Sequence, residues 1–164
     1  MTEKDDIKDG LVEEFYRRGF LEVILGKKPK LQLRENWKNG KKDGLFEEYY
    51  ENGQLMYRSN YKNGKKDGLV EMYLENGNTM DIFNFKNGEY HGLREQFYLK
   101  GQTKQRENYK NGERDGLMEV YHKNGNLMEM TNWKDGERDG LCEYFDEDGN
   151  LTDTEEYKDG ELIE

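Results

Sequence analysis

Residues 50–77 read YENGQLMYRSNYKNGKKDGLVEMYLENG and contain one full copy of a short sequence unit, followed by the start of the next copy. The dipeptide Asn-Gly occurs three times in this stretch, and Asp-Gly-Leu occurs once. Asn-Gly is a strong short-range signal for a hairpin turn. The runs between these dipeptides are rich in aromatic and apolar residues, as β-strands are. The stretch therefore predicts consecutive β-hairpins.

The unit recurs along the chain with a period of 24 residues. Three glycine tracks, a leucine track, two aromatic tracks and a glutamate track keep this step, and Gly10 and Gly19 extend two of the glycine tracks to an N-terminal copy. One glycine track consists of Gly44, Gly68, Gly92, Gly116 and Gly140. Self-similarity at about 20 to 50 residues indicates a tandem repeat protein. The chain is predicted to hold six copies.

Each copy is predicted to form two strands. In the second copy the strands cover residues 44–50 and 54–62, and a type I′ turn at Asn52-Gly53 joins them. Residues 63–68, NGKKDG, are expected to be a linker to the next hairpin. The expected fold is all-β: an elongated, solenoid-like, single-layer antiparallel sheet of six tandem β-hairpin repeats, in which each copy adds roughly 9.5 Å.

One domain is expected, with an N-terminal tail at residues 1–8, a first repeat at 9–43 and five regular repeats at 44–67, 68–91, 92–115, 116–139 and 140–164. The first repeat carries an insertion near residues 22–31. Leu21, Val23 and Leu25 alternate with other residues, which predicts a lengthened hairpin that turns at Gly26–Pro29. Terminal repeats often cap an exposed edge, so a capping role is favoured over a binding one.

The composition is unusual for a folded chain. Hydrophobic residues make up 32%, charged residues 38%, and the mean hydropathy is -1.28. Aromatic residues nevertheless make up 13% and are regularly spaced, and a stack of small units builds no thick core. A net charge of -10 argues against nucleic acid or an anionic membrane as the main partner. The start lacks the pattern of a signal peptide, so a cytoplasmic protein is expected, although an exported form with its signal removed is compatible.

The unit resembles the MORN (membrane occupation and recognition nexus) repeat, and more closely the bacterial MORN-variant repeat of antitoxin-like proteins. The resemblance rests on Asp-Gly-Leu and Tyr-Lys-Asn-Gly at fixed spacing and covers nearly the whole chain. His91, Lys100, Thr79 and Thr103 depart from the pattern. The resemblance implies an elongated sheet-like scaffold with protein-binding roles, and the family name suggests lipid binding.

The sequence predicts no catalytic residue, metal site or cofactor, and hence no enzyme. Its two histidines, His91 and His122, each occupy a slot that other residue types fill in the other copies, whereas acid–base or metal chemistry needs several such groups together. Cys142 is interpreted as a small strand residue. The segment DEDGN at 146–150 is interpreted as a turn rather than a calcium loop.

The glutamate track is interpreted as architecture. A two-residue turn at Asn52-Gly53 would pair Glu47 with Arg58 across the strands, and the same register pairs Glu95 with Arg106. In the other copies the partners would be Ile82, Met130 and Thr154.

Positions that differ between copies are free to serve function. The candidate partner-binding residues are Phe46, Met56, Val70, Met72, Met80, Ile82, Met118, Val120, Met128 and Met130. Methionine-rich surfaces suit adaptable recognition. Two interpretations stay open, because these side chains could instead fill the inner face of a curled sheet.

Charge is concentrated at the C-terminal end, where residues 140–164 hold ten acidic residues and one lysine. The candidate residues for steering a basic partner are Asp146, Glu147, Asp148, Asp153, Glu155 and Glu156. The alternative is a solubilising cap. The predicted function is a non-catalytic protein-binding scaffold, in its sharper form an antitoxin or immunity protein. A peripheral membrane module is the alternative, and the sheet edges could pair with a second copy.

Overall fold

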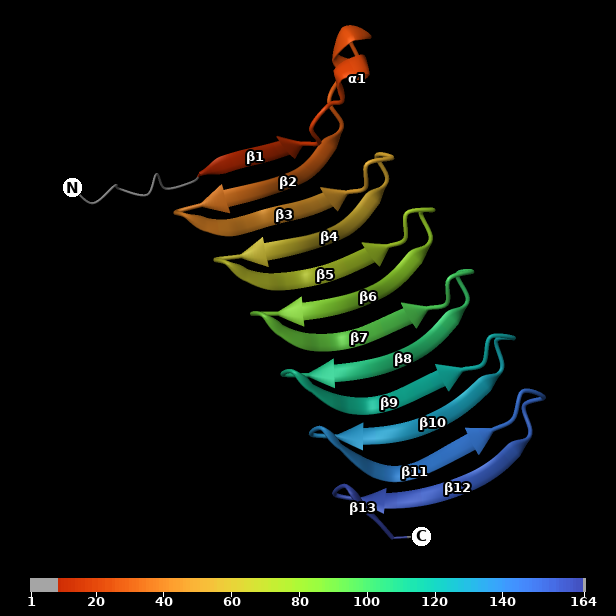
Figure 1. Cartoon of the computed structure of the whole chain (residues 1–164). Helices are drawn as coiled ribbons and strands as arrows, with labels where there is room; N and C mark the ends of the chain where they lie inside the picture. Colours follow the sequence, from red (N-terminus) through yellow and green to blue (C-terminus); the bar gives the residue numbers. More distant parts are fainter. Residues whose placement is uncertain (1–8, 164) are drawn as a thin grey trace.

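The computed structural model describes residues 9–163, and these residues form one antiparallel sheet of 13 strands that are arranged in chain order (Figure 1). Each strand from β2 to β12 pairs with the strand before it and the strand after it, and β1 and β13 are the edge strands. This architecture confirms the all-β, single-layer repeat fold. The strands are β1 (Gly10–Phe15), β2 (Leu31–Lys38), β3 (Lys41–Tyr49), β4 (Leu55–Lys62), β5 (Lys65–Tyr73), β6 (Thr79–Lys86), β7 (Glu89–Phe97), β8 (Thr103–Lys110), β9 (Glu113–Tyr121), β10 (Leu127–Lys134), β11 (Glu137–Phe145), β12 (Leu151–Lys158) and β13 (Glu161–Leu162).

The tight two-residue turns join the strands along one side of the sheet. They lie at Asn63-Gly64 and its equivalents, and not at Asn52-Gly53 as predicted. Between β4 and β5, Asn63 has φ 52° and Gly64 has φ 84°, both in the left-handed region that a type I′ turn requires. The segment NGKKDG at 63–68 is therefore not a linker, because Lys65 already begins β5. Each expected linker is a hairpin turn followed directly by a strand.

The turns that join the other ends of the strands are longer. In the turn at residues 50–54, the backbone N–H of Gly53 donates to the carbonyl of Tyr50 at 2.8 Å, and the side-chain oxygen of Asn52 accepts from the N–H of Gln54 at 2.8 Å. The pairing register shifts between Glu48 and Tyr49, where a bulge absorbs the additional residue. The bulge preserves the predicted register, so the pairing of Glu47 with Arg58 is confirmed although the predicted turn type is wrong.

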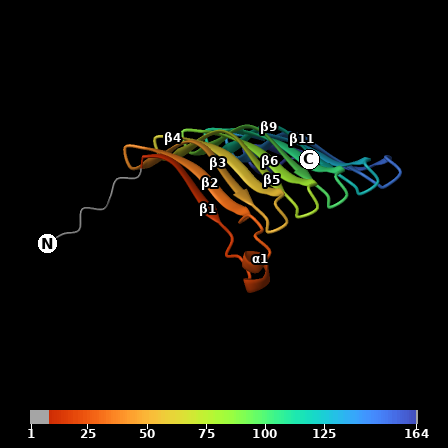
Figure 2. The same ribbon diagram turned by 90° about the horizontal axis from the view of Figure 1, so that it is seen from above.

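The strands of the regular repeats bend, so that the sheet is arched in cross-section (Figure 2). The bend coincides with a second register shift, which on β4 lies between Ser59 and Tyr61, opposite Gly68 at φ 106° on β5. A Cβ atom at the equivalent Gly44 would stand 3.3 Å from the Cβ of Asn36 on the neighbouring strand. Glycine at this position therefore allows both the left-handed backbone and the close approach that the bend needs.

The arch explains how a single-layer sheet buries side chains. A row of residues across the middle of one face is buried: Glu35, Phe46, Ser59, Val70, Phe83, Glu107, Met118, Thr131 and Cys142. These residues oppose one another in adjacent strands, as Phe46 opposes Ser59 and Val70 opposes Phe83. Side chains converge on the inner side of a bent sheet and spread apart on its outer side. We call the face with the buried row the trough face and the other face, which carries Leu45 and Glu47, the stripe face.

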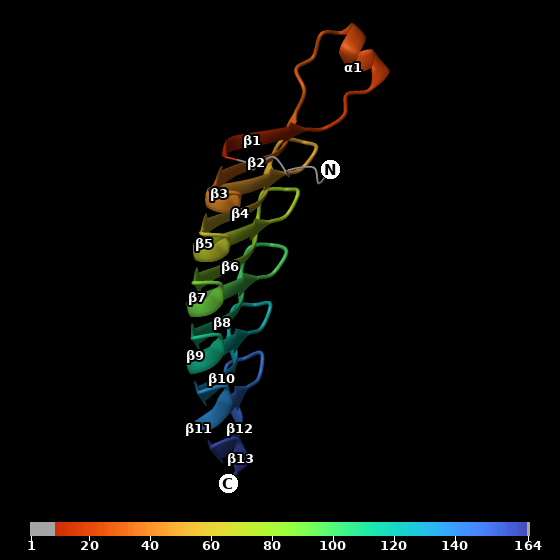
Figure 3. The same ribbon diagram turned by 90° about the vertical axis from the view of Figure 1, so that its left-hand side faces the viewer.

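The insertion in the first repeat is helical, so the predicted lengthened hairpin is wrong. Helix α1 (Phe20–Ile24) follows β1, and no strand resumes before Leu31. The side chain of Glu22 accepts a hydrogen bond from the N–H of Gly19 at 3.1 Å, and the N–H of Leu25 donates to the carbonyl of Leu21 at 2.9 Å. The insertion projects beyond the first strand and away from the remaining units (Figure 3). None of the strands in residues 9–163 lies beside the insertion to favour extended backbone.

Candidate binding faces of the sheet

Aromatic side chains line one side of the trough face and alternate with cationic ones, except where Tyr90 takes the place of a cation. The row contains Trp37, Lys42, Tyr61, Lys66, Phe85, Tyr90, Tyr109, Arg114, Trp133, Arg138 and Tyr157. Arg114 lies 4.8 Å from the ring centroid of Trp133, and Arg138 lies 5.0 Å from that of Tyr157. Phe85 and Tyr90 stack at 4.5 Å. These rungs are half-buried and hold successive units together through cation–π and aromatic contacts.

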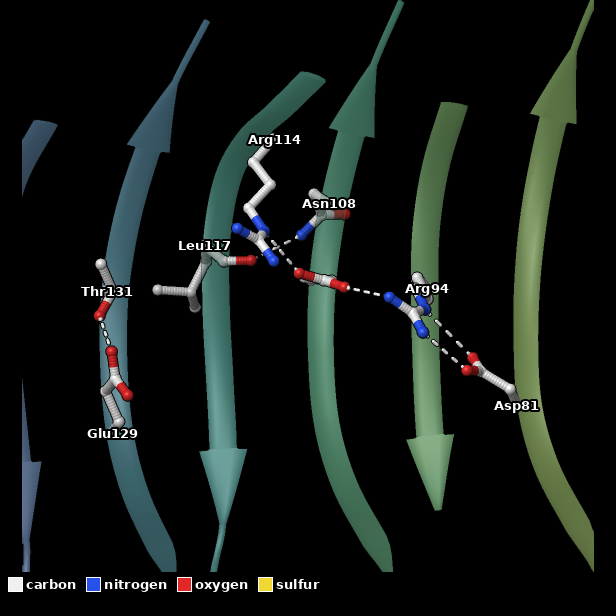
Figure 4. Close-up of polar contacts among 8 residues, drawn as sticks. Asp81, Arg94, Asn108, Arg114, Leu117, Glu129 and Thr131 are labelled. Atoms are coloured by element: carbon white, nitrogen blue, oxygen red, sulfur yellow. Dashed lines mark hydrogen bonds and ion pairs between the residues drawn. The ribbon is translucent and has the colours of Figure 1, made fainter. Parts of the chain in front are cut away.

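The middle of the trough face holds an ion network (Figure 4). Arg94 makes two contacts with Asp81, at 2.8 and 3.2 Å, and a third with Glu107 at 2.9 Å. Arg114 contacts the second oxygen of Glu107 at 2.8 Å. Burial alone would lower the pKa of Arg94, but the hydrogen bond and charge of Asp81 and the charge of Glu107 outweigh it and raise that pKa. The two arginines balance the two carboxylates, so the network is electrically neutral and links adjacent units.

Glutamates on the stripe face form hydrogen bonds and ion pairs with neighbouring side chains. Glu47 accepts a hydrogen bond from the hydroxyl of Tyr49 at 2.7 Å and contacts Arg58 at 3.0 Å. Burial and the hydrogen bond to Glu47 raise the pKa of Tyr49. The predicted ion pair between Glu95 and Arg106 is also present, at 2.8 Å. This track is architecture, as predicted, with tyrosine and arginine as its partners.

A row of exposed leucines runs beside the glutamates on the stripe face. Each leucine opposes an asparagine, except that Leu141 opposes Glu156. Asn108, for example, donates its side-chain N–H to the carbonyl of Leu117 at 3.1 Å (Figure 4). Five of these leucines are between 36 and 58% exposed, and nothing in the described chain covers them. We call this row the leucine stripe; it consists of Leu11, Leu45, Leu69, Leu93, Leu117 and Leu141.

The structure divides the predicted partner-binding residues between the two faces. Phe46, Val70 and Met118 are buried in the middle of the trough face, and Met72 and Val120 flank them there. The remaining five lie elsewhere, on the stripe face or at the start of a strand. Ile82 and Met130 oppose stripe-face glutamates, and Met56, Met80 and Met128 lie at the bulged starts of their strands. The set therefore does not form one surface.

The predicted acidic residues are also divided. Asp146 accepts hydrogen bonds from the side chain of Asn150 and from the N–H groups of Asn150 and Asp148, which lower its pKa, so it organises a turn. Glu155 lies on the trough face and accepts from the hydroxyls of Tyr144 at 2.7 Å and Tyr157 at 3.0 Å, which lower its pKa. The four with exposed side chains are Glu147, Asp148, Asp153 and Glu156, of which Asp153 accepts a hydrogen bond from the N–H of Thr154 at 2.9 Å.

The search for a metal site among the described residues found none. Residues 9–163 contain no group of three or more His, Cys, Asp and Glu side chains arranged to hold a metal ion. A ring nitrogen of His122 lies 2.9 Å from the carbonyl of Phe145, as the hydroxyl of Tyr98 lies 2.7 Å from the carbonyl of Tyr121, so this histidine links two units. The described part also has no helix long and apolar enough to cross a membrane.

The comparisons with known proteins agree with this geometry. A family model described as MORN repeat variant matches residues 42–63, 66–87, 90–111, 114–135 and 138–159. Each matched segment runs from the second residue of one strand, across the longer turn and the next strand, to the first residue of a tight turn. A search of curated proteins returned no match.

Proposed function

We propose, from the premise that this chain belongs to the MORN repeat variant family, that it is a non-catalytic scaffold that binds another protein on its stripe face. The observation that carries the proposal is the leucine stripe. Leucines exposed at every second strand recur at roughly 9.5 Å, and they lie on the face whose side chains are not needed to fill the trough. Regular exposed apolar side chains on a repeat scaffold are typical of an extended binding surface.

The surroundings of the stripe indicate what the partner must offer. Glutamates run beside the leucines along the whole sheet, and only some of them are paired with arginine. A partner with apolar side chains flanked by lysine or arginine would complement both rows. The same acidic row makes this face a poor surface for an anionic membrane.

The C-terminal unit supports a sharper version of the proposal. Glu147, Asp148, Asp153 and Glu156 are exposed at the end where the chain concentrates its negative charge. Such an end would attract a basic partner and accelerate its encounter with the sheet. An antitoxin or immunity protein that occludes a basic toxin would use the charge in this way, and a nuclease whose cleft attracts phosphate is the corresponding partner.

Affinity purification of the tagged protein from lysate of its own organism tests the proposal, with the retained proteins identified by mass spectrometry at low and high salt. The test variant carries Leu69→Ser, Leu93→Ser and Leu117→Ser. The matched control carries Leu99→Ser, Leu151→Ser and Leu162→Ser, which are exposed leucines outside the stripe. Circular dichroism verifies that both variants fold.

A partner retained by the wild type and the control, and lost by the stripe variant, is the expected result. Neutralising the acidic end with Glu147→Gln, Asp148→Asn and Asp153→Asn should weaken binding mainly at low salt, because screening already removes the attraction at high salt. If the stripe variant and the control retain the same proteins, the stripe face does not bind them and the proposal fails.

A further inference from the structure

The insertion ends in an exposed apolar tip. We call residues 20–25 the apolar tip; among them Phe20 is 81% exposed, Leu21 71%, Ile24 63% and Leu25 68%. The one charged side chain in this run, Glu22, is engaged by the N–H of Gly19. The apolar side chains follow one another almost without interruption, so they point to all sides of a single helical turn rather than to one face.

Basic residues surround the base of the tip. Residues 17–30 contain five of them and one acidic residue, which is opposite in sign to the net charge of -10 for the whole chain. We call these five residues the basic collar: Arg17, Arg18, Lys27, Lys28 and Lys30. Four of them, all but Lys27, line a cleft of about 80 Å³ together with Tyr16, Glu22 and Glu51. The charged collar and the apolar tip are thus segregated along the insertion.

Hydrogen bonds hold the insertion on the sheet. The guanidinium of Arg18 donates to the carbonyl of Lys27 at 2.8 Å, and the N–H of Tyr16 donates to the carbonyl of Lys30 at 2.9 Å, which closes the stem. The hydroxyl of Tyr16 reaches the carbonyl of Tyr49 at 2.6 Å, and Lys30 reaches that of Glu51 at 2.7 Å. The tip is therefore presented from a braced base beyond the first strand (Figure 3).

We propose that the apolar tip inserts into the interface of an anionic lipid bilayer while the basic collar binds lipid phosphates. Apolar side chains on all sides suit a fluid environment that surrounds the tip, whereas one shaped groove on a protein would leave part of them in water. Lysine and arginine next to inserted apolar residues are attracted to anionic headgroups. The collar cleft is where a headgroup phosphate would lie.

This docking is independent of the leucine stripe. The tip projects from one end of the sheet, so a membrane-bound molecule would keep both faces of the repeats free (Figures 1 and 3). The net charge of the whole chain argued against anionic membranes, but screening confines each charge to about 8–10 Å. The acidic C-terminal unit lies at the opposite end of the sheet from the tip.

Vesicle flotation of the full chain tests the proposal, with vesicles of phosphatidylcholine alone and of phosphatidylcholine mixed with phosphatidylglycerol. The expected result is binding to the mixed vesicles that weakens with salt. Lys27→Gln with Lys28→Gln should weaken it about 25-fold, since each basic residue near the surface contributes about fivefold. Leu21→Ser, Ile24→Ser and Leu25→Ser together should abolish binding, whereas Leu99→Ser with Lys100→Gln, at an exposed turn elsewhere, should leave it unchanged.

An emission probe locates the contact directly. In a Phe20→Trp variant, the introduced indole should shift its emission to the blue on mixed vesicles and not on phosphatidylcholine alone. The proposal is overturned if the chain does not float, or if it floats equally well with the tip variants. It is also overturned if light scattering shows a tip-dependent dimer that binds no vesicles, because the tip would then dock on a second copy.

Discussion

Arg94 occupies a slot in the trough that is filled by smaller or apolar side chains in the other regular units. The equivalent residues are Phe46, Val70, Met118 and Cys142. Its cross-strand neighbours, Asp81 and Glu107, supply the carboxylates that make a guanidinium acceptable there. A buried charge is stable only when it is paired, so these three residues form one energetic unit.

Replacing Arg94 alone should therefore be costly. Arg94→Val leaves Asp81 and Glu107 buried with one cationic partner fewer, and we expect a loss of about 3 kcal/mol in the free energy of unfolding. Urea unfolding followed by circular dichroism measures it. The triple variant Arg94→Val, Glu107→Phe and Asp81→Gln introduces side chains found at the equivalent positions of other units, and it should recover most of the loss. A single variant as stable as the wild type would contradict this account.

The network could have been predicted from the sequence only in part. The register that pairs Glu47 with Arg58 also places Glu107 opposite Arg94. The sequence indicates this pair because Arg94 and Glu107 introduce opposite charges at two facing positions of the same copy. The third member, Asp81, lies diagonally across the next strand pair, opposite Gln96 rather than Arg94. Its contact depends on the reach of the arginine side chain, which spacing does not reveal.

At the scale of the strands and turns, the two turn types have different requirements. The tight turn at Asn63-Gly64 places a residue other than glycine at φ 52°. Asparagine and aspartate tolerate this conformation better than other residues with a side chain, so Asn63→Ala should lower the free energy of unfolding by about 1 kcal/mol. The matched control is Glu51→Ala in the longer turn, where no positive φ is needed before Gly53, and it should change stability by less than about 0.5 kcal/mol. Equal effects of the two variants in urea unfolding would contradict the turn assignment.

The sequence held enough information to assign these turns correctly. The positions before the tight-turn glycines are Asn39, Asn63, Asn87, Asn111, Asp135 and Asp159, all of which tolerate positive φ. In the other track Lys100 precedes Gly101. A lysine is poorly suited to the left-handed region, so that track cannot consist of type I′ turns. The helical insertion was harder to predict, because Leu21, Val23 and Leu25 fit an alternating pattern and the absence of a pairing strand is visible only in three dimensions.

The last complete hairpin should respond to acid through Glu155. Hydrogen bonds from Tyr144 and Tyr157 hold the pKa of Glu155 below its ordinary value of 4.5. A depressed carboxylate pKa adds stability above the unfolded-state pKa, and this contribution disappears as the pH falls through the folded-state pKa. Hydrogen-exchange protection of β12, corrected for intrinsic rates, should therefore fall between about pH 5 and pH 3.

A charge-neutral variant isolates this effect. Glu155→Gln removes the titrating group, so protection of β12 should lose most of its pH dependence in that range. Glu156→Gln, on the other face of the same strand, should behave like the wild type. If Glu155→Gln and the wild type lose protection in parallel, other carboxylates cause the response.

At the scale of the whole molecule, the two faces of the sheet differ in purpose. The trough face carries the aromatic row, the ion network and the buried residues, and these contacts hold successive units together. The stripe face leaves its leucines uncovered. The sequence predicted the open sheet and its register, because the 24-residue period repeats in every track. It could not assign side chains to faces, since each bulge shifts the alternation and two bulges occur in each of the four regular copies at residues 44–139.

The central claim is that adjacent residues of one strand point to opposite faces, one buried in the trough and the next exposed on the leucine stripe. Thiol labelling tests this claim most directly. Cys142 is 0% exposed in the trough, and its neighbour Leu141 is 45% exposed on the stripe. We compare native-state labelling of the wild type with that of Leu141→Cys in a Cys142→Val background, because Val70 fills the equivalent slot. The account predicts that the Leu141→Cys thiol reacts at close to the rate of an unfolded chain, and Cys142 at least about 100-fold more slowly. Equal rates for the two thiols would contradict it.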